Sequence, residues 1–472
     1  MTEDWDVVVV GGGSSGLPLA IFAAGRGARV LLLDHAPQLG GTLWVASGQM
    51  SAAGTRLQRE KGISDSAEEH YEDVMRISRG SADPALVRLA VDNAAATFDW
   101  LEEQGFHALP DHPVAGSAHE PYRKDRYYWG EGGGRAVRDT LVPLVMRHVE
   151  EGRISLKLEH EVVELLLDTN GAVTGVNARD GDGCIHRFQA SSTVLTCGGY
   201  GANPGMFEEL NGYPQYTSQP YPFARGAGIR MGLAAGGYLR GQENVYNNFG
   251  SLLNSDEFPC PLAGRVVTYP EMRLPWEIYV NAEGKRFVRE DVASVDAREM
   301  ALSMQTSRRY WIVFDQHILD HAPPLLLGWT AQQQKQAFVE GGPAFLSSDS
   351  LAGLAIKAGI DPAALENTVE GYNYGVDTGN DFFGRHHLPV RIQRGPFYAL
   401  RMQGAATSSA VGLAVNDRLQ VIRPDGVPIP NLYAAGELLG SGQTMGKAAC
   451  GGMMVTPAMT FGRLLGDRIL PL

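Results

Sequence analysis

Cysteine is scarce in this chain, and its few cysteines form no metal-binding pattern. Cys184, Cys197, Cys260 and Cys450 occur without a C-x-x-C or C-x-x-C-H motif. This spacing argues against a zinc site, an iron–sulfur cluster and a c-type haem. We therefore expect no bound metal and four free thiols, as in cytosolic proteins.

Long hydrophobic runs and an excess of positive charge are also missing. No apolar run approaches the roughly 20 residues that a membrane helix needs. A first strand that begins within about five residues of the amino terminus leaves no room for a signal peptide. The net charge of −13 disfavours nucleic acid and anionic membranes as main partners. We expect a cytoplasmic protein with no nucleic-acid partner and no membrane insertion.

What the chain does have is enough apolar sequence for sizeable cores. It contains 472 residues, of which 44% are hydrophobic, and this length predicts two or three domains. The composition changes near residue 240, and a strand-and-turn pattern returns from Gly395 onward. The sequence therefore predicts one domain from residues 1–240 and 395–472 and a second domain from residues 241–394.

The first 34 residues have the pattern of a nucleotide-binding β-α-β unit. An apolar strand over 6–10 runs directly into the turn Gly11-Gly12-Gly13-Ser14-Ser15-Gly16, and a helix over 17–28 and a strand over 30–33 follow. The glycines permit a tight turn, a close approach of backbone to a pyrophosphate, and close packing of helix on strand. Asp34 ends the second strand, where an acid typically holds a ribose hydroxyl.

A long irregular segment over residues 107–134 is rich in polar aromatic residues. It contains three histidines, Tyr122, Tyr127, Tyr128 and Trp129, together with several cations. Loops of this length are frequently functional. We therefore expect this segment to contribute to a substrate site.

Several motifs along the whole chain are similar to motifs of one protein superfamily. The sequence resembles the FAD-binding fumarate reductase/succinate dehydrogenase flavoprotein superfamily. Within it, the carboxyl-terminal motifs are most similar to the 3-ketosteroid Δ1-dehydrogenases and related cyclic-ketone desaturases. The motifs that carry the resemblance are Val7–Val10 with the Gly-rich turn, Val194–Gly199, Gly284–Phe287, Tyr372-Asn373 with Phe383–Arg385, Asn431–Glu437, Met445–Lys447 and Pro457–Gly462.

The resemblance implies an α/β fold, with a doubly wound Rossmann-type FAD-binding domain and an inserted α+β capping domain that contacts substrate. It also implies FAD, bound non-covalently because no histidine occurs in residues 40–50. A helix starting near Thr456 would direct its dipole at the flavin N1/C2 region. The cofactor-binding residues that it implies are Gly11, Gly13, Ser15, Gly16, Asp34, His35, Gly41, Thr42, Gly48, Val162, Gly198, Gly436, Glu437, Met454, Val455 and Thr456.

Two departures from the family pattern concern the chemistry. The segment over 292–297 has neither the arginine of the reductases nor the tyrosine of the steroid enzymes, and it offers Ser294 and Asp296 instead. The second anchor of the family, an arginine or a tyrosine, falls at Ala448 or Ala449 here. A dicarboxylate substrate therefore loses support, and Lys447 with the backbone amides of Gly451 and Gly452 remains near that position.

The candidate base is a tyrosine of the irregular segment. Tyr127 and Tyr128 follow Arg123, Lys124 and Arg126, and nearby cations favour the phenolate. The alternative for each is a pocket-wall aromatic, which is also the expectation for Trp129. Ser294 and the Gly452 amide are further catalytic candidates. Arg123, Tyr246 and Lys447 are candidates for substrate binding, Arg126 and Arg225 for a carboxylate clamp, and His107, His112 and His119 are expected to be ordinary loop histidines.

The sequence therefore predicts an FAD-dependent oxidoreductase acting on CH–CH groups. We expect a desaturase that forms a C=C bond next to the carbonyl of a cyclic ketone or 3-ketosteroid-like small molecule. A tyrosine would remove the α-proton, flavin N5 would accept the β-hydride, and an external acceptor would take the electrons. The reverse activity, a fumarate-reductase-type reductase of an unsaturated acid or enone, stays open. So does an electron-relay subunit that works within a complex.

Overall fold

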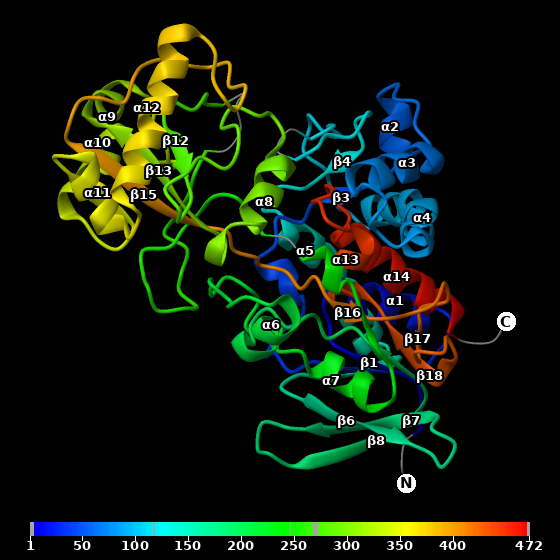
Figure 1. Cartoon of the computed structure of the whole chain (residues 1–472). Helices are drawn as coiled ribbons and strands as arrows, with labels where there is room; N and C mark the ends of the chain where they lie inside the picture. The colour runs from blue at the N-terminus through cyan, green and yellow to red at the C-terminus, as the bar shows by residue number, and fades with distance from the viewer. Residues whose placement is uncertain (1–3, 117–118, 246, 268–271, 470–472) are drawn as a thin grey trace.

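The computed structural model describes residues 4–116, 119–245, 247–267 and 272–469. Within these ranges the strands form two main sheets, of eight and six strands. The two sheets lie in separate lobes, and the lobe with the first sheet also holds both chain ends (Figure 1). This α/β architecture confirms the predicted fold class.

The first sheet is centred on the strand that precedes the Gly-rich turn. Its order is β17-β18-β8-β1-β2-β5, and the strands from β18 to β5 pair in parallel, while β6 and β7 extend β8 in antiparallel fashion. The apolar runs of β1 and β2 pair over four residues and are buried, as expected for a parallel sheet covered on both faces. The strands are β1 (Asp4–Val10), β2 (Val30–Leu33), β5 (Ile154–Lys157), β6 (Glu161–Leu167), β7 (Val173–Arg179), β8 (Ile185–Leu195), β17 (Gln420–Ile422) and β18 (Pro428–Ala434).

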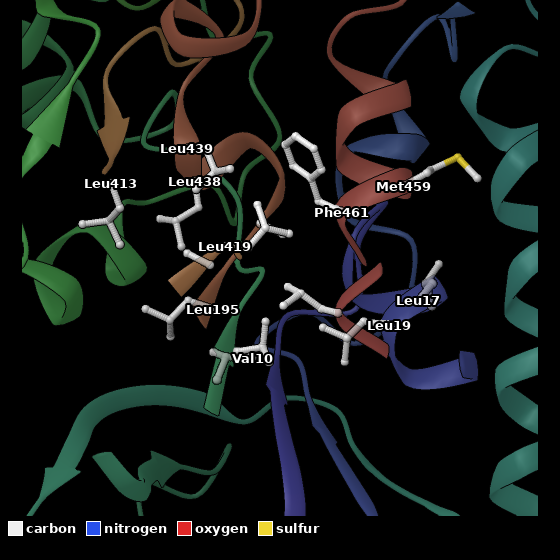
Figure 2. Close-up of a cluster of buried hydrophobic side chains, with 14 of the residues drawn as sticks. Val10, Leu17, Leu19, Leu195, Leu413, Leu419, Leu438, Leu439, Met459 and Phe461 are labelled. Carbon is white, nitrogen blue, oxygen red and sulfur yellow. The ribbon is translucent and has the colours of Figure 1, made fainter. Parts of the chain in front are cut away.

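The first and last long elements of the chain pack against each other. Helix α1 (Gly16–Gly25) contacts α14 (Val455–Arg468), and glycines of α14 make the close approach possible. A Cβ on Gly462 would lie 2.1 Å from the Ser15 carbonyl oxygen, and one on Gly466 would lie 2.6 Å from that of Leu19. This packing brings the amino end of α14 next to the Gly-rich turn. Figure 2 shows part of the apolar core here, with Val10, Leu17, Leu19, Leu195, Leu413, Leu419, Leu438, Leu439, Met459 and Phe461.

The second lobe has its own antiparallel sheet and its own apolar core. Its strands are β10 (Ser251–Leu252), β11 (Gly264–Arg265), β12 (Ile278–Val280), β13 (Arg309–Asp315), β14 (Phe345–Ser348) and β15 (Phe397–Gln403). Helices α8 (Val295–Ser303), α9 (Gln316–His321), α10 (Ala331–Glu340), α11 (Leu351–Ala358) and α12 (Pro362–Thr378) accompany this sheet. In Figure 1, α8 lies on the side of this lobe that faces the first lobe.

The last strand of the second sheet lies beyond the predicted domain boundary. Strand β15 pairs with β13 over its whole length, from Arg309 opposite Gln403 to Asp315 opposite Phe397. The chain therefore returns to the first lobe after Gln403 rather than at residue 395. We propose a capping unit that includes β15, because removing this strand would break the centre of its sheet.

The predicted helices agree with the observed ones to within a few residues. The patterns over 66–78, 84–104 and 135–151 correspond to α3, α4 and α5, and Ser66 caps α3 by accepting a hydrogen bond from the Glu69 amide. Within the described ranges, no helix has the length and apolar character to cross a membrane. The remaining helices and strands are α2 (Arg56–Glu60), α3 (Ala67–Ile77), α4 (Pro84–Glu103), α5 (Gly134–Glu150), α6 (Pro204–Asn211), α7 (Ala227–Ala234), α13 (Ser441–Thr444), β3 (Met50–Ser51), β4 (Tyr127–Tyr128), β9 (Leu239–Arg240) and β16 (Gly412–Leu413).

Candidate active site

A long cavity follows the carboxyl ends of the central parallel strands. Val10, Leu33 and Thr196 line it where β1, β2 and β8 end, and Val455 lines it at the start of α14. Ligands of open α/β sheets bind at this edge, because the loops that follow the strands form a crevice there. The cavity therefore has the position of a nucleotide-cofactor site.

The Gly-rich turn fits a bound pyrophosphate because its backbone is tightly constrained. Gly11 has φ +106°, and a Cβ on it would lie 2.7 Å from the Cys197 Cα and from the Thr196 carbonyl oxygen. A Cβ on Gly16 would lie 1.9 Å from the Gly11 carbonyl oxygen. Side chains are therefore excluded at both positions, and the backbone can approach a phosphate group closely.

Asp34 is fixed at the end of β2 by two backbone amides. Its Oδ2 accepts from the Gly12 amide at 2.7 Å and its Oδ1 from the Ala36 amide at 2.8 Å. Burial raises the pKa of Asp34, and these two hydrogen bonds oppose that shift. The carboxylate lines the cavity beside the Gly-rich turn. This is the position expected for a group that binds ribose hydroxyls.

Two helices direct their amino ends into the same cavity. Ser15, the N-cap of α1, and Met454, the N-cap of α14, make no side-chain capping hydrogen bond, and both line the cavity. The amide groups and the dipole at each end therefore favour negative charge on a ligand. This donor set fits FAD: the amides at the start of α1 would hold its pyrophosphate, and those at the start of α14 would stabilise negative charge on its flavin.

Fourteen of the sixteen predicted cofactor residues line the cavity, and Gly16 and Thr456 do not. Gly16 instead permits the close packing of α1 on the turn. Thr456 is buried, and its hydroxyl accepts from the Ser51 amide at 2.8 Å, so it joins α14 to β3. The residues in the cavity wall are Gly11, Gly13, Ser15, Asp34, His35, Gly41, Thr42, Gly48, Val162, Gly198, Gly436, Glu437, Met454 and Val455.

The other end of the cavity is formed by Tyr127 and the segment before α14. Tyr127 lines the wall, and a Cβ on Gly451 would lie 3.0 Å from its Cζ. Gly452 also lines the wall, with φ +79°, and its carbonyl oxygen accepts from the Thr456 amide at 3.0 Å. The phenol and two glycines of the α14 entry therefore form one surface. We call this surface the reaction end, and the opposite surface around Asp34 the cofactor end.

The structure separates the two candidate tyrosines. They are consecutive residues of β4, and successive side chains of a strand point to opposite faces. Tyr128 is fully buried, with its hydroxyl 2.8 Å from Thr55 Oγ1 and its ring centroid 4.1 Å from that of Phe98. Burial raises its pKa. The structure therefore does not support Tyr128 as a base.

Other predicted catalytic and substrate residues lie outside the cavity wall. Ser294 is the N-cap of α8, where its hydroxyl accepts from the Ala297 amide. Arg123 is exposed and forms ion pairs with exposed Glu72 and with buried Asp73. Lys447 is exposed. Local capping and ion pairing outside the cavity explain the positions of Ser294 and Arg123.

The two remaining predictions concern aromatic residues. Trp129 packs against His112 and Tyr127, with ring centroids 3.9 Å and 5.1 Å away, so it supports the Tyr127 ring from behind the wall. Tyr246 lies outside the described residues. Trp129 itself is not part of the cavity wall.

The two other predicted clamp arginines do not meet at the reaction end. Arg126 is fully buried and is paired with Asp65 and Asp73. Arg225 lines the cavity next to Phe223, whose ring lies 5.1 Å from that of His35. Arg225 is therefore at the cofactor end. Among the described residues of the reaction-end wall there is no arginine or lysine.

His119, which was expected to be an ordinary loop histidine, lines the cavity. Its Nδ1 lies 2.9 Å from Asp296 Oδ1 and 3.8 Å from Glu299 Oε2. Asp296 also accepts from the Glu120 amide at 2.8 Å and from the Ala449 amide at 3.3 Å. The available signal was the i, i+3 spacing of the two acids, which places them on one face of a helix. Sequence alone did not connect that face to the 107–134 segment.

Burial and charge oppose each other within this cluster. Burial lowers the pKa of His119, but the hydrogen bond to Asp296 and the nearby carboxylates outweigh it, so the net pKa is raised. Burial raises the pKa of Glu299 to about 7. Despite burial, the pKa of Asp296 is lowered by its bond to His119. The raised pKa of His119 and the lowered pKa of Asp296 both favour an imidazolium–carboxylate pair.

A family profile described as FAD binding domain matches residues 6–453 of the chain. The chain belongs to this family. It is an FAD-dependent oxidoreductase of the kind that acts on CH–CH groups.

Individual relatives include both reductases and dehydrogenases. The chain is 29% identical to the fumarate reductase (cytochrome) of Shewanella frigidimarina, over 98% of the chain and 76% of that protein. It is 26% identical to the 4-oxocyclohexanecarboxylate 2-dehydrogenase of Sinomonas cyclohexanicum, over 98% of the chain and 92% of that protein. The 3-ketosteroid Δ1-dehydrogenase of Sterolibacterium denitrificans shares the fold, with a TM-score of 0.77 and 21% identity over 99% of each chain.

Proposed function

We propose that this chain is an FAD-dependent desaturase that forms a C=C bond next to the carbonyl group of a cyclic ketone, with Tyr127 as the base. The observation that carries the proposal is the position of Tyr127 in the reaction-end wall, against Gly451. It is the predicted tyrosine that the strand geometry turns toward the cavity. The Tyr127 phenol and the residues just before α14 therefore line the same part of the cavity.

In the proposed reaction, each group handled by the protein has a defined fate. Tyr127, as phenolate, takes the α-proton, and the electron pair of that C–H bond moves onto the carbonyl oxygen as an enolate. Bound FAD supplies the two-electron acceptor for the β-hydride. The enolate then returns to a ketone as the C=C bond forms. The electrons leave to an external acceptor and the proton on Tyr127 leaves to solvent, so the enzyme ends each cycle unchanged.

The side chains of the reaction end do not favour a dicarboxylate substrate. A dicarboxylate is usually held by arginine side chains, which bind carboxylates in bidentate fashion. The described residues of this wall include neither arginine nor lysine. A relative whose name is 4-oxocyclohexanecarboxylate 2-dehydrogenase supports a cyclic ketone as the substrate class.

A second candidate is the reverse activity, reduction of an enone or an unsaturated acid. The 29% identity to a fumarate reductase favours it. Tyr127 would then act as the proton donor rather than the base, since the same group serves both directions of a reversible step. The two candidates differ in which substrates change the redox state of the flavin.

Anaerobic mixing distinguishes them. Oxidised holoenzyme is mixed with cyclohexanones and 3-ketosteroids, and the flavin absorbance is followed in a stopped-flow instrument. We expect bleaching by at least one saturated ketone. If no ketone bleaches the flavin, while enones or fumarate reoxidise the chemically reduced enzyme, the desaturase proposal is wrong and the reductase takes its place.

A further inference from the structure

We propose that His119 is the cationic hydrogen-bond donor that holds the carbonyl oxygen of the substrate and stabilises the enolate. This inference rests on the proposed function and assigns the anchor for the substrate that the reaction requires. Removal of an α-proton places negative charge on the carbonyl oxygen, and a donor aimed at that oxygen lowers the barrier. The protein must supply such a donor at the end of the cavity where Tyr127 lies.

The hydrogen bonding of His119 leaves one ring nitrogen for a ligand. Because Nδ1 faces the Asp296 carboxylate at 2.9 Å, Nδ1 carries a proton that it donates to that carboxylate. In the imidazolium form Nε2 is also a donor. Within the described part of the chain, no residue forms a hydrogen bond or an ion pair with His119 Nε2. The ring lines the cavity, so this second donor is available to a bound molecule.

Asp296 fixes the imidazole to the wall that faces the substrate. Asp296 Oδ1, which pairs with His119, also lies 3.3 Å from the Ala449 amide. Asp296 Oδ2 accepts a hydrogen bond from the Glu120 amide. Ala449 lines the cavity two residues before Gly451, which contacts Tyr127. One carboxylate therefore joins α8, the His119 segment and the α14 entry, so Asp296 is a positioning residue for the imidazole.

No other basic side chain of the described wall lies at this end of the cavity. His160 donates its backbone amide to the Asp34 carbonyl, and Arg225 and His35 lie around Phe223, so all three belong to the cofactor end. Ala449, Gly451 and Gly452 have no hydrogen-bond donor in a side chain. An oxyanion next to Tyr127 therefore has His119 as its one cationic partner within the described wall.

The carboxylates around the ring favour its protonated form. Asp296 and Glu299 of α8 raise the pKa of His119, while burial and Arg298 of the same helix lower it, and the net pKa lies above the usual 6.5. Cys450, on the α14 entry, is buried and burial raises its pKa, so it adds no charge. His119 is therefore a cationic donor at pH values below its raised pKa, and it loses the Nε2 proton as the pH rises through that pKa.

A metal ion is the competing occupant of this cluster. The ligand atoms of His119, Asp296 and Glu299 lie within 4.8 Å of one another, and they form the one such group among the described residues. The Arg298 cation lies close enough to lower the pKa of His119, and the same charge opposes a metal cation. A chelator therefore belongs in the test.

The test measures binding of 4-nitrophenol, whose phenolate resembles a planar enolate, to oxidised holoenzyme. We compare the dissociation constants of wild type and His119→Gln across neutral and alkaline pH. A charge-assisted hydrogen bond predicts that the substitution weakens phenolate binding by about 10- to 100-fold near pH 7. The ratio of the two constants should fall as the pH rises through the pKa of His119. For Asp296→Asn, the same fall should occur at lower pH.

The matched control is His107→Gln, because His107 belongs to the same segment but is exposed and outside the wall. It should bind 4-nitrophenol as wild type does. Unchanged flavin absorbance and unfolding temperature in each variant exclude misfolding, and His119→Asn, which retains a donor toward Asp296, should show the same loss of phenolate binding as His119→Gln.

Three results would overturn the proposal. The first is equal binding of 4-nitrophenol by wild type and His119→Gln with the same pH dependence. The second is no binding of 4-nitrophenol to wild type. The third is a loss of binding when wild type is treated with EDTA that equals the loss caused by His119→Gln. The last result would identify a metal site instead. Because binding needs no turnover, a failure of every ketone to bleach the flavin rejects the proposed function alone, and the binding ratio still decides the role of His119.

Discussion

The cofactor end and the reaction end of one cavity are built by different means. At the cofactor end, backbone groups dominate: the turn over 11–16, the amides that hold Asp34, and the amino end of α1. At the reaction end, side chains from two distant parts of the chain come together: His119 and Tyr127 of the 107–134 segment line the cavity, and Asp296 of α8 binds His119. The comparison shows that binding of the cofactor depends on local backbone shape, whereas the proposed chemistry depends on how the two lobes meet.

This difference has consequences for mutation. A defect at the cofactor end should remove FAD and with it every activity. A defect at the reaction end should leave FAD in place and change rate, ligand binding or pH dependence. The predictions that follow test this division.

The largest effect is expected from Gly11→Ala. A Cβ there would lie 2.7 Å from backbone atoms of Cys197 and Thr196, at φ +106°, so the strand ends must shift. Strain of this kind typically costs 1–3 kcal/mol, which predicts a loss of FAD affinity of about tenfold or more. The measurement is the ratio of flavin to protein absorbance after gel filtration. Gly25→Ala is the control, since a Cβ there meets nothing within 4 Å, and equal FAD content in both variants would contradict the division.

Tyr127→Phe should lower the rate of flavin reduction while FAD stays bound. Loss of a general base typically costs about 10²-fold or more in rate. Tyr128→Phe is a matched control one residue away, because its hydroxyl contacts Thr55 in the core, and it should keep the wild-type rate. Stopped-flow reduction by the best ketone measures both. A retained rate for Tyr127→Phe would remove Tyr127 from the mechanism.

Glu299→Gln should stabilise the protein at alkaline pH. The folded-state pKa of Glu299 is raised to about 7 from 4.5, so its charged form opposes folding once the pH exceeds the folded value. The folded state binds the extra proton between these values, so the penalty grows as the pH rises from 4.5 to 7 and is complete above 7. The variant should gain on the order of 1–3 kcal/mol at pH 8 relative to wild type and little at pH 4.5. Denaturant unfolding at both pH values checks this, and a gain that is equal at both would refute it.

The smallest effect is expected from Arg123→Ala. Its side chain is 58% exposed and pairs with Glu72 and Asp73 outside the wall. The exposed pair with Glu72 contributes about 0–1 kcal/mol, and buried Asp73 keeps its ion pairs with Arg76 and Arg126, so stability should change little. The ratio kcat/KM should stay within about twofold of wild type, since no contact to the ligand space is lost. A large rise in KM would restore Arg123 as a substrate residue and weaken the comparison.

The cofactor end could be predicted from the sequence because its signals are local. The spacing of Gly11, Gly13 and Gly16 and the acid at Asp34 follow from one β-α-β unit, in which turn chemistry and strand pairing involve neighbouring residues. Fourteen of the sixteen predicted cofactor residues line the cavity. The residues from the carboxyl-terminal part, such as Glu437 and Val455, came from the resemblance rather than from local physics.

At the reaction end, the sequence indicated which segment lies near the cavity, but it did not indicate which side chains of that segment point into the cavity. Both tyrosines of β4 lie near the cavity, but alternation along the strand points Tyr127 to the wall and Tyr128 into the core. Ser294 matched a family position, yet its local role as an N-cap decides its contacts. A sequence pattern does not distinguish these outcomes, since each depends on a face or a cap that only the folded chain defines.

By itself, the sequence determined the nucleotide-binding turn, the apolar strands that pair around it, and the helices whose caps and glycines mark their ends. These follow from interactions between residues close together in the chain. Only the tertiary structure decided that Asp296 and Glu299 of α8 meet His119, about 180 residues earlier, and that Asp296 also reaches Ala449. Such contacts depend on the packing of one lobe on the other, because hydrogen bonds between distant residues form only after the lobes have been brought together.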